Sequence, residues 1–490
     1  MKKRPNILFI LADDQGAWSL GSAGNSEIIT PNLDDLAERG IRFENFFCAS
    51  PVCSPARASI ATAMMPSGHG VLDWLSSGGM DRKLFGKGEL EKRYAKEDKP
   101  IRFLEDFYTY PEILEQEGYV CGLSGKWHLG DHIRPAPGFK NWYTIGQGGC
   151  PYFAADIVQD GKVQIQTDYI THLITNNALE QLEELSSQQQ PFYLSVHYTA
   201  PHSPWNKEHH PKEYLDLYKD CPFHSTPDMP VHPNQTMASQ VGDTPENRRE
   251  FLTGYYAAIT AMDEGIGKIV KKLEELGERE NTLIVFTADN GICMGHHGAW
   301  GKGNATFPQN MYEESVKVPA IVWAPEIDGA GRTMQGLYSH CDWYNTLLDY
   351  AGILDYAQNE HACGESFAYL LQGEKESQKR NEIFVFEEYG SVRMIRNKKM
   401  KYVHRYPDGF CELYDLEKDP EEKENLVEQK EYQQMICEMQ KQLFEQFEKC
   451  TIPVNSGLLY PVQGRGQRKK LDGTMQGVFD TYPTTNQNKK

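Results

Sequence analysis

The sequence predicts an α/β protein with a large, mostly parallel sheet flanked by helices and a smaller antiparallel sheet near the C-terminus. Continuous apolar runs bounded by polar residues are typical of strands buried on both faces of a parallel sheet. The clearest such runs are 6–12, 119–124, 191–198 and 282–288. Apolar residues at helical spacing between Tyr255 and Leu276 predict an amphipathic helix that packs on this core.

The composition changes near Gly373, where short apolar runs with tight connections predict the antiparallel sheet. The expected strands are 383–386, 392–396, 401–404 and 411–414, after one more strand of the large sheet at 318–323. A charged helix follows through about Lys449, and the polar tail from Thr451 is expected to be irregular. We therefore predict a catalytic domain over residues 1–372 and a C-terminal subdomain over residues 373–490.

Charge and composition narrow the class of partner. The 490 residues carry a net charge of −19, which argues against binding to nucleic acid or to an anionic membrane surface. No apolar run approaches the roughly 18 residues of a membrane helix. The 11 cysteines are an odd number scattered along the chain, unlike a disulfide framework. An anionic substrate would need a local basic pocket.

The N-terminus imitates a secretory signal without completing one. Residues 1–4 are basic and residues 7–12 are apolar, but the apolar run is short and continues into Asp13-Asp14 with no small-residue cleavage site. We interpret this run as the first strand of the domain and expect a cytoplasmic protein.

Two of the predicted strands end in pairs of oxygen ligands. Asp13-Asp14 follows the first strand and Asp289-Asn290 follows the strand at 282–288. Open α/β sheets build their sites at the carboxyl ends of their strands. Carboxylate and amide oxygens suit Ca²⁺ or Mg²⁺. An aspartate pair can also simply form a turn, so the metal site depends on the two pairs meeting.

Further polar residues lie where a site could form. Cys53-Ser54-Pro55-Ala56-Arg57 precedes a predicted helix over 58–64, with Arg57 in its first turn, where a helix favours anions. Lys126 and His128 alternate after a strand and would face one side. His202 lies between two prolines, and Lys302 lies in a glycine-rich segment. Taken singly, Cys53 could be an ordinary buried thiol and the others surface residues.

Together these features resemble the type I (formylglycine-dependent) sulfatases of the alkaline phosphatase superfamily, over roughly residues 5–430. Cys53 to Arg57 matches the Cys-x-Pro-x-Arg signature of that family. The other markers are Asn-Ile-Leu-Phe-Ile-Leu-Ala-Asp-Asp, Gly-Lys-Trp-His-Leu-Gly, Ala-Pro-His-Ser-Pro, Asp-Asn-Gly and Glu-Leu-Tyr-Asp-Leu. The resemblance implies an alkaline-phosphatase-like fold and a hydrolase of sulfate monoesters.

The resemblance also implies roles for single residues. The metal ligands would be Asp13, Asp14, Asp289, Asn290 and the modified Cys53, with Ca²⁺ as the ion and Mg²⁺ as the alternative. Cys53 would be oxidised to formylglycine by a formylglycine-generating or anaerobic sulfatase-maturating enzyme. Arg57 would hold the aldehyde hydrate, and Lys126 and Lys302 would bind sulfate oxygens. His202 would protonate the leaving alcohol, and His128 would accept a proton when sulfate is eliminated.

The chain departs little from the family pattern. Ala56 replaces the more frequent Ser of the signature, and Asn290 stands where other members carry His. Segments 72–107 and 206–248 match nothing in the family pattern, and we expect them to determine the choice of substrate.

Several activities fit this resemblance. The segment His-Gly-x-Trp-x-Lys at 297–302 favours a sulfated carbohydrate, with aryl or steroid sulfates second. Phosphonate monoester hydrolases and phosphodiesterases of the same superfamily use the same nucleophile. Choline sulfate would call for an aromatic or acidic pocket. A non-catalytic carbohydrate-binding protein is a further alternative, which the complete set of catalytic positions disfavours.

Overall fold

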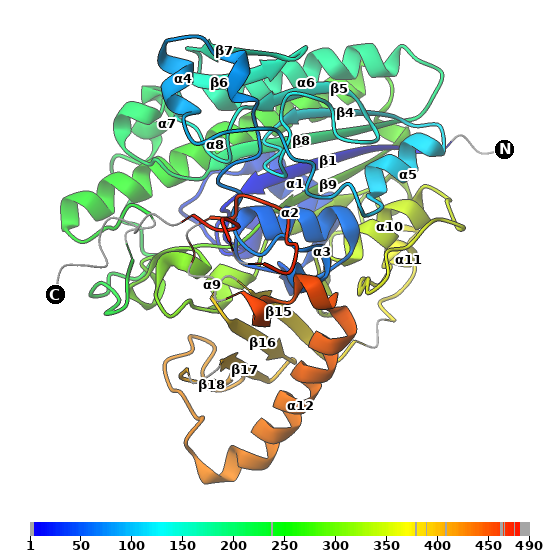
Figure 1. Cartoon of the computed structure of the whole chain (residues 1–490). Helices are drawn as coiled ribbons and strands as arrows, with labels where there is room; N and C mark the ends of the chain where they lie inside the picture. Colours follow the sequence, from blue (N-terminus) through cyan, green and yellow to red (C-terminus); the bar gives the residue numbers. More distant parts are fainter. Residues whose placement is uncertain are drawn as a thin grey trace.

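A computed structural model shows a ten-stranded mixed sheet between two layers of helices, with a four-stranded antiparallel sheet at one end (Figure 1). The structure describes residues 4–236, 239–377, 380–388, 390–406, 409–460, 464, 466–474 and 476–480. The first residues of the signal-like segment, 1–3, therefore lie outside the described residues. Within the described part of the chain, no helix is long and apolar enough to cross a membrane.

The central strands of the large sheet run parallel, as predicted. The order is β13-β2-β12-β9-β1-β8-β4-β5-β6-β7, and the strands from β9 to β5 are parallel to one another. Antiparallel pairs at both sides make the sheet mixed. The bounds are β1 Asn6–Asp13, β2 Ile41–Phe43, β4 Val120–Gly125, β5 Phe139–Ile145, β6 Ala155–Gln159, β7 Lys162–Gln166, β8 Phe192–Pro201, β9 Thr282–Ala288, β12 Ala320–Trp323 and β13 Arg332–Met334.

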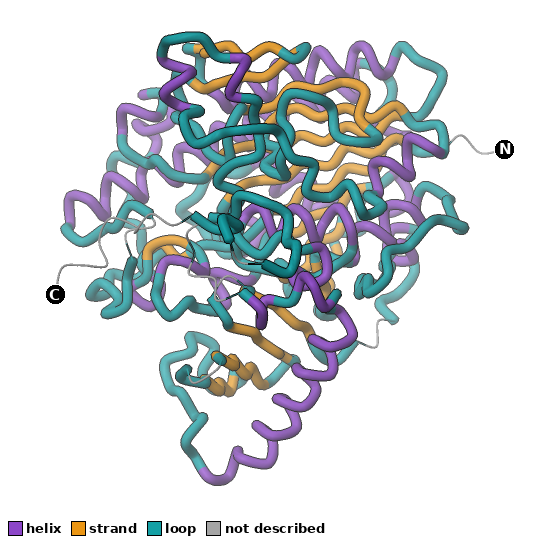
Figure 2. The backbone as a smooth tube through the Cα atoms, in the orientation of Figure 1, coloured by secondary structure: helices purple, strands orange, loops and turns teal. Residues whose placement is uncertain are grey.

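Burial explains the sequence of the central strands. Every residue of β1 and β9 is buried, because helices cover both faces of the sheet (Figure 2). Strands in that position must be apolar throughout, which is why their runs are unbroken in the sequence. Two short two-stranded sheets accompany the large one: β3 (Phe46–Phe47) with β14 (Tyr338–Ser339), and β10 (Cys293–Met294) with β11 (Trp300–Gly301).

The helices form two groups. One group packs around α8 and includes α1 (Pro31–Arg39), α6 (Ile170–Ser186), α7 (Lys212–Leu217) and α8 (Pro245–Glu275). The other packs around α2 and α10 and includes α2 (Cys53–Thr62), α3 (Pro66–His69), α5 (Tyr110–Gln116), α10 (Asp342–Tyr350) and α11 (Ala368–Leu371). Two short helices lie outside these groups, α4 (Glu89–Arg93) and α9 (Glu313–Val316).

Helix α8 is longer than the sequence predicts. It begins at Pro245, where the Thr244 side chain accepts a hydrogen bond from the Asn247 N–H. Its first turn is polar and mostly exposed, so no apolar spacing marks it before Phe251. The segment 206–248 is consequently less irregular than expected, since it contains α7 and the start of α8.

Helix α2 also differs from its predicted bounds. It begins at Cys53 and ends at Thr62, so Arg57 lies in the second turn and not in the first. All of its residues are buried, which removes the polar face that would have marked it as amphipathic. Cys53 thus sits at the first position of a helix that is enclosed on all sides.

The predicted C-terminal sheet is present as four antiparallel strands, and α12 (Gln433–Cys450) packs on it. Its strands are β15 Ile383–Glu387, β16 Val392–Arg396, β17 Met400–Arg405 and β18 Glu412–Asp415. The described part of the tail after α12 is irregular, as predicted, apart from two 3₁₀ turns, whereas residues 461–463, 465, 475 and 481–490 lie outside the described residues. The described part of the tail returns to the helices beside the large sheet. The side chain of Asn455 donates to the Gly68 carbonyl, and Gln467 contacts the segment after α3. The division at residues 372 and 373 stays a prediction.

Candidate functional site

The predicted site residues converge at the carboxyl ends of neighbouring parallel strands. Asp13 ends β1 and Asp14 follows it, Asp289-Asn290 follows β9, and β1 lies between β9 and β8 in the sheet. A hydrogen bond joins the two pairs directly, since the Asp14 N–H donates to Asp289 Oδ1 at 3.1 Å. The topology therefore brings together residues that lie far apart in the sequence.

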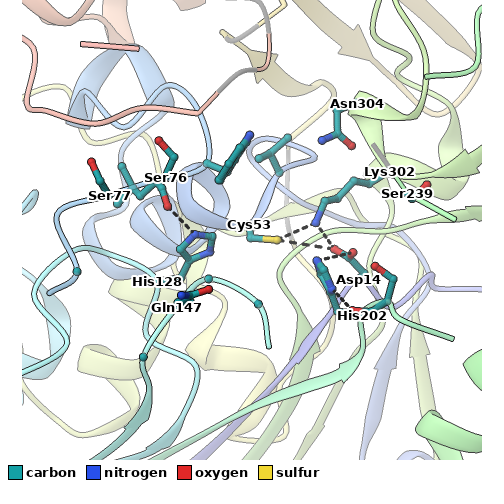
Figure 3. A pocket seen from close by; sticks show the side chains of 18 of the residues that line it. Asp14, Cys53, Ser76, Ser77, His128, Gln147, His202, Ser239, Lys302 and Asn304 are labelled. Atoms are coloured by element: carbon teal, nitrogen blue, oxygen red, sulfur yellow. Dashed lines mark hydrogen bonds and ion pairs between the residues drawn. The ribbon is translucent and has the colours of Figure 1, made fainter. Parts of the chain in front are cut away.

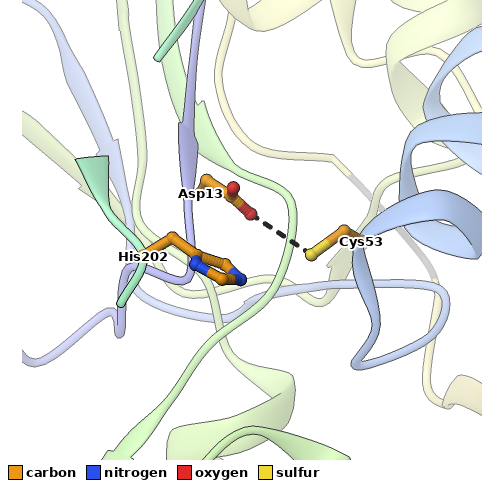
Figure 4. A group of neighbouring side chains, drawn as sticks. All are labelled: Asp13, Cys53 and His202. Atoms are coloured by element: carbon orange, nitrogen blue, oxygen red, sulfur yellow. Dashed lines mark hydrogen bonds between the residues drawn. The ribbon is translucent and has the colours of Figure 1, made fainter. Parts of the chain in front are cut away.

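Cys53 faces the carboxylates from the start of α2. Its Sγ lies 3.2 Å from Asp13 Oδ1 and 3.8 Å from Asp14 Oδ1. Figure 4 shows Cys53 approaching Asp13 from one side and His202 from the other. Potential ligand atoms of Asp13, Asp14, Cys53 and Asp289 all lie within 4.8 Å of one another.

Three buried cations neutralise the three carboxylates. Arg57 Nε donates to Asp289 Oδ2 at 2.9 Å. Lys126 Nζ lies 2.5 Å from Asp13 Oδ2. Lys302 Nζ lies 2.5 Å from Asp14 Oδ1 and 2.8 Å from the Cys53 sulfur.

The charges around the site set its protonation states. Burial raises the pKa of Asp13, but the surrounding cations, Lys126 first among them, lower that pKa to about 2. Burial lowers the pKa of Lys302, whereas Asp14 and its neighbours raise it well above its ordinary value. Burial, together with the charge of Asp13, raises the pKa of the unmodified Cys53 thiol. Asp13 and Lys302 are thus charged at neutral pH, and the thiol is not.

The two histidines reach the site by different routes. Figure 3 shows His128 and His202 on opposite sides of Cys53. Strand β4 ends at Gly125, and His128 adopts φ 56°, so the expected strand-like alternation with Lys126 is absent. His202 follows β8, and its Nε2 lies 3.6 Å from Asp14 Oδ2, an ion pair when the ring is protonated. Both nevertheless line the cavity above the sulfur.

The oxygen-rich group fits a divalent cation. Asn290 Nδ2 donates to Asp14 Oδ1 at 2.8 Å, while Asn290 Oδ1 is buried and accepts no hydrogen bond from any residue that the structure describes. A buried amide oxygen without a donor beside three carboxylates is suited to a metal ion. The donor set contains oxygen with a single sulfur, which favours Ca²⁺ or Mg²⁺ over Zn²⁺.

A cavity of about 500 Å³ opens onto this group. Trp74 and Trp205 provide apolar walls. The rest of the lining contains both charged and neutral polar side chains, several of which Figure 3 labels. These neutral side chains are Ser76, Ser77, Gln147, Ser239 and Asn304. The segment 72–107 contributes much of the lining, including Arg93, Tyr94, Lys96 and Glu97, whereas the segment 206–248 contributes Ser239.

A glycine-rich loop at 146–149 is a part of the site that sequence reasoning missed. A Cβ at Gly148 would lie 2.0 Å from His128 Nε2, and one at Gly149 would lie 3.6 Å from His202 Cε1. The loop therefore spans the two histidines at van der Waals contact. Two adjacent glycines after a strand were the available signal, because they permit such an approach.

This geometry defines a class of enzyme. Buried carboxylates, three cations and a side chain at a helix N-terminus meet below an open cavity, which suits metal-assisted hydrolysis of an anionic ester. A family model described as "Sulfatase" matches residues 5–353, and one described as "N-sulphoglucosamine sulphohydrolase, C-terminal" matches residues 296–449. The chain belongs to the sulfatase family, of the type I class in the alkaline phosphatase superfamily, and is a sulfuric ester hydrolase.

Curated relatives support the same assignment. An N-acetylglucosamine-6-O-sulfatase of Bacteroides thetaiotaomicron is 28% identical, over 90% of this chain and 87% of the relative. An ulvan-active sulfatase of Formosa agariphila is 28% identical, over 90% and 80%. A choline-sulfatase of Rhizobium meliloti is 28% identical, over 87% and 83%.

Solved structures share the fold over most of the chain. A protein in complex with its substrate D-glucosamine-2-N,6-O-disulfate aligns with a TM-score of 0.75 and 25% identity, covering 91% of this chain and 98% of the other. A phosphonate monoester hydrolase of Agrobacterium radiobacter aligns with a TM-score of 0.69 and 21% identity, covering 92% and 97%. The second likeness concerns the fold alone.

Proposed function

We propose that this enzyme removes a sulfate group from a sulfated carbohydrate, with a formylglycine derived from Cys53 as its nucleophile. The observation that supports the proposal most directly is the position of Cys53. Its side chain lies at the base of the cavity, within hydrogen-bonding distance of Asp13 and Lys302. A group placed there can meet a sulfate ester that enters from the cavity.

The modified side chain supplies a carbon that carries two hydroxyl groups when hydrated, one to attack sulfur and one to expel sulfate. Arg57 is placed to orient it, since its guanidinium is buried beside Asp13 and Asp289. One Arg57 nitrogen, Nη2, makes no hydrogen bond in the described structure and remains available to an oxygen at position 53.

A divalent cation, Ca²⁺ by our proposal and Mg²⁺ as the alternative, would withdraw charge from the sulfate oxygens. Asp13, Asp14, Asp289 and Asn290 would hold it. Because three cationic side chains already balance the three carboxylates, an added dication would leave the site positive. This local positive charge would attract an anionic ester even though the net charge of the whole protein is −19.

Metal dependence gives the first test. Asp289→Ala should lower both the bound metal measured by elemental analysis and the activity, because Asp289 contacts Asp14 and Arg57 at the centre of the site. Activity that survives exhaustive chelation, in protein shown to be free of divalent cations, would contradict the assignment.

The remaining side chains of the site would either neutralise the sulfate oxygens or transfer protons. Lys126 and Lys302 would neutralise sulfate oxygens from their positions beside the carboxylates. His202 is our candidate to protonate the leaving oxygen, because its Nε2 faces Asp14 at the cavity floor. His128 is our candidate proton acceptor, since burial and the charge of Lys126 lower its pKa and keep it neutral.

The cavity lining supports a sugar more than an aryl or steroid group. The hydroxyl and amide side chains of Ser76, Ser77, Gln147, Ser239 and Asn304 suit the hydroxyl groups of a saccharide. Trp74 can pack against an apolar ring face. A steroid would leave these polar groups unpaired, which costs free energy.

A substrate panel tests the proposal. We expect higher kcat/KM on defined O-sulfated mono- and disaccharides than on nitrophenyl, steroid or choline sulfate, and than on a matched nitrophenyl phosphodiester or phosphonate ester. Peptide mass spectrometry at Cys53 should detect the aldehyde. A preference for phosphodiesters would contradict the proposal that sulfate esters are the main substrates. A preference for aryl sulfates would contradict only the proposal that the substrate is a carbohydrate.

A further inference from the structure

The C-terminal tail packs against a segment that forms one wall of the active-site cavity. This segment contains Trp74, Leu75 and Ser76. Gln467 is fully buried although it belongs to no helix or extended strand. It forms an isolated parallel bridge with Leu75, which lines the cavity. The tail, red in Figure 1, crosses in front of α2. A buried amide in an irregular segment needs partners for each of its polar atoms.

The side chain of Gln467 has those partners. Its Oε1 accepts from the Leu72 N–H at 2.8 Å, and its Nε2 donates to the carbonyls of Gly70 and Lys469, both at 2.9 Å. Since the partners are an N–H group and two carbonyls, the orientation of the amide is unambiguous. Both ends of the amide are engaged, and two of its three bonds hold the chain that leads to Leu75.

The backbone of Gln467 continues this connection. Its N–H donates to the Trp74 carbonyl at 2.8 Å, and its carbonyl accepts from the Ser76 N–H at 2.9 Å. Trp74 and Ser76 flank Leu75, so the tail holds the segment on both sides of that residue. Gln467 thus makes four hydrogen bonds of 2.9 Å or less to residues 70–76. Its neighbours add two more to the same wall, because the Gly466 N–H donates to Asp73 Oδ2 and the Arg468 carbonyl accepts from Ser77 Oγ.

Leu75 in turn forms hydrogen bonds with residues on both sides of the reaction site, next to Cys53 and at His128. Its N–H donates to Ser54 Oγ at 3.1 Å, next to Cys53, and its carbonyl lies 3.2 Å from His128 Nε2. A carbonyl can only accept, so His128 Nε2 must carry the hydrogen and Nδ1 must keep the lone pair. His128 Nδ1 is buried and has no hydrogen-bond partner in the described part of the chain.

We propose that Gln467 is a positioning residue that holds the Leu75 carbonyl and, through it, the proton-accepting tautomer of His128. The inference rests on the proposed function, in which His128 accepts a proton as sulfate is eliminated. Gln467 does not line the cavity, whereas Leu75 does, so Gln467 acts through Leu75. Within the tail, this role belongs to Gln467, which supports the reaction site from behind the cavity wall.

The test compares Gln467→Met, which has a similar volume and no amide, with Lys470→Gln. Lys470 also belongs to the tail but pairs with Glu105 and Asp106 on the surface. In Gln467→Met we expect kcat to fall about 10-fold to 100-fold, the scale of lost support to a functional side chain. Sulfate should remain covalently attached at position 53 by intact-mass measurement, and hydrogen exchange over 70–76 should accelerate. Lys470→Gln should match the unsubstituted enzyme in all three.

Two further results decide the outcome. If Gln467→Met does not fold, Gln467→Glu, which keeps the acceptor and loses both donors, receives the same measurements. Faster exchange over 70–76 with unchanged kcat and no trapped sulfate would overturn the proposal, because the tail would then support structure only. Failure of the proposed function is seen separately: the unsubstituted enzyme would lack the aldehyde at Cys53 or would not hydrolyse sulfate esters.

Discussion

Residue chemistry determines what position 53 can do. A buried thiol beside Asp13 is held in its neutral form, because burial and the neighbouring carboxylates raise its pKa well above the ordinary value. An unmodified Cys53 would therefore be a poor nucleophile in this setting. The surroundings suit a group that is neutral and can accept hydrogen bonds from Lys302 and Arg57, as the hydroxyls of an aldehyde hydrate would.

The first prediction concerns this position. Cys53→Ser should abolish multiple turnover, since one hydroxyl can accept sulfate but no second hydroxyl on the same carbon can expel it. The substitution should leave circular dichroism and thermal unfolding close to those of the parent, because the side chains are similar in size. Intact mass should show a stable gain of SO₃ after substrate is added. Sustained turnover by this variant would refute the role of Cys53.

The second prediction separates the two histidines. A general acid matters most for a poor leaving group, and a sugar alkoxide needs a proton far more than a nitrophenolate does. His202→Ala should therefore slow hydrolysis of a sulfated sugar by about 10²-fold to 10⁴-fold and that of nitrophenyl sulfate much less. His128→Ala should slow both substrates equally and leave sulfate attached at position 53.

The opposite pattern would reverse these roles. Equal losses on both substrates in His202→Ala, together with trapped sulfate in that variant and none in His128→Ala, would make His202 the proton acceptor. The separation of the two rings on either side of Cys53 in Figure 3 is what makes distinct roles geometrically reasonable.

Several site residues were predictable because they follow unbroken apolar runs. Asp13 ends β1, while Asp289 and Lys126 come directly after β9 and β4, so their position at the sheet edge follows from the strands alone. Ser76, Gln147 and Gln467 carry no such signal. They lie in irregular segments, and their places depend on contacts between parts of the chain that are far apart in sequence.

At the scale of elements, the site is assembled by strands and closed by loops. The bounds of β9 and β16 agree with the predicted runs, because alternation and apolar content decide such strands locally. Helix starts were harder to predict: α2 is buried all round and the first turn of α8 is polar. Tertiary packing, which the local pattern does not report, determines both.

The third prediction belongs to the loop at 146–149. Gly148→Ala would place a methyl group 2.0 Å from His128 Nε2, where the ring already meets the Leu75 carbonyl. Because the ring is buried, it must move by a substantial fraction of an ångström. We expect kcat to fall on the order of 100-fold, as displacement of catalytic groups does. Steady-state kinetics on the sulfated sugar measures this loss.

Gly161→Ala is a matched control, because nothing lies within 4 Å of a Cβ there, although its positive φ makes some loss of stability expected. Unchanged kcat in Gly148→Ala would show that the loop yields without moving His128.

At the scale of the whole molecule, a buried ion network joins the C-terminal sheet to α9. Glu313, at the start of α9, pairs with Arg396 of β16 at 3.2 Å and with Lys401 of β17 at 3.2 Å. Lys401 also pairs with Glu422 at 2.7 Å, and Glu422 accepts from the Glu313 N–H at 2.8 Å. Each buried charge has a partner, which is the condition for tolerating them at an interface.

This network gives the molecule a predictable response to acid. Burial raises the pKa of Glu313, but the charges of Arg396 and Lys401 outweigh it and lower that pKa to about 2 from an ordinary 4.5. A lowered carboxyl pKa contributes stability that is fully present above the unfolded value and is lost as the pH falls toward the folded value. The contribution of Glu313 should therefore disappear between pH 4.5 and about 2.

The last prediction follows from the lowered pKa of Glu313. Glu313→Gln should lower the free energy of unfolding at pH 7 by about 2 kcal/mol, since two buried cations lose a charged partner. The loss should shrink as the pH falls below 4.5, because the parent carboxylate is then protonated as well. Thermal unfolding across this pH range measures the difference, with Glu431→Gln, an exposed glutamate, as the control. Parallel curves for parent and variant at every pH would show that Glu313 does not provide the acid-sensitive contact between α9 and the C-terminal sheet.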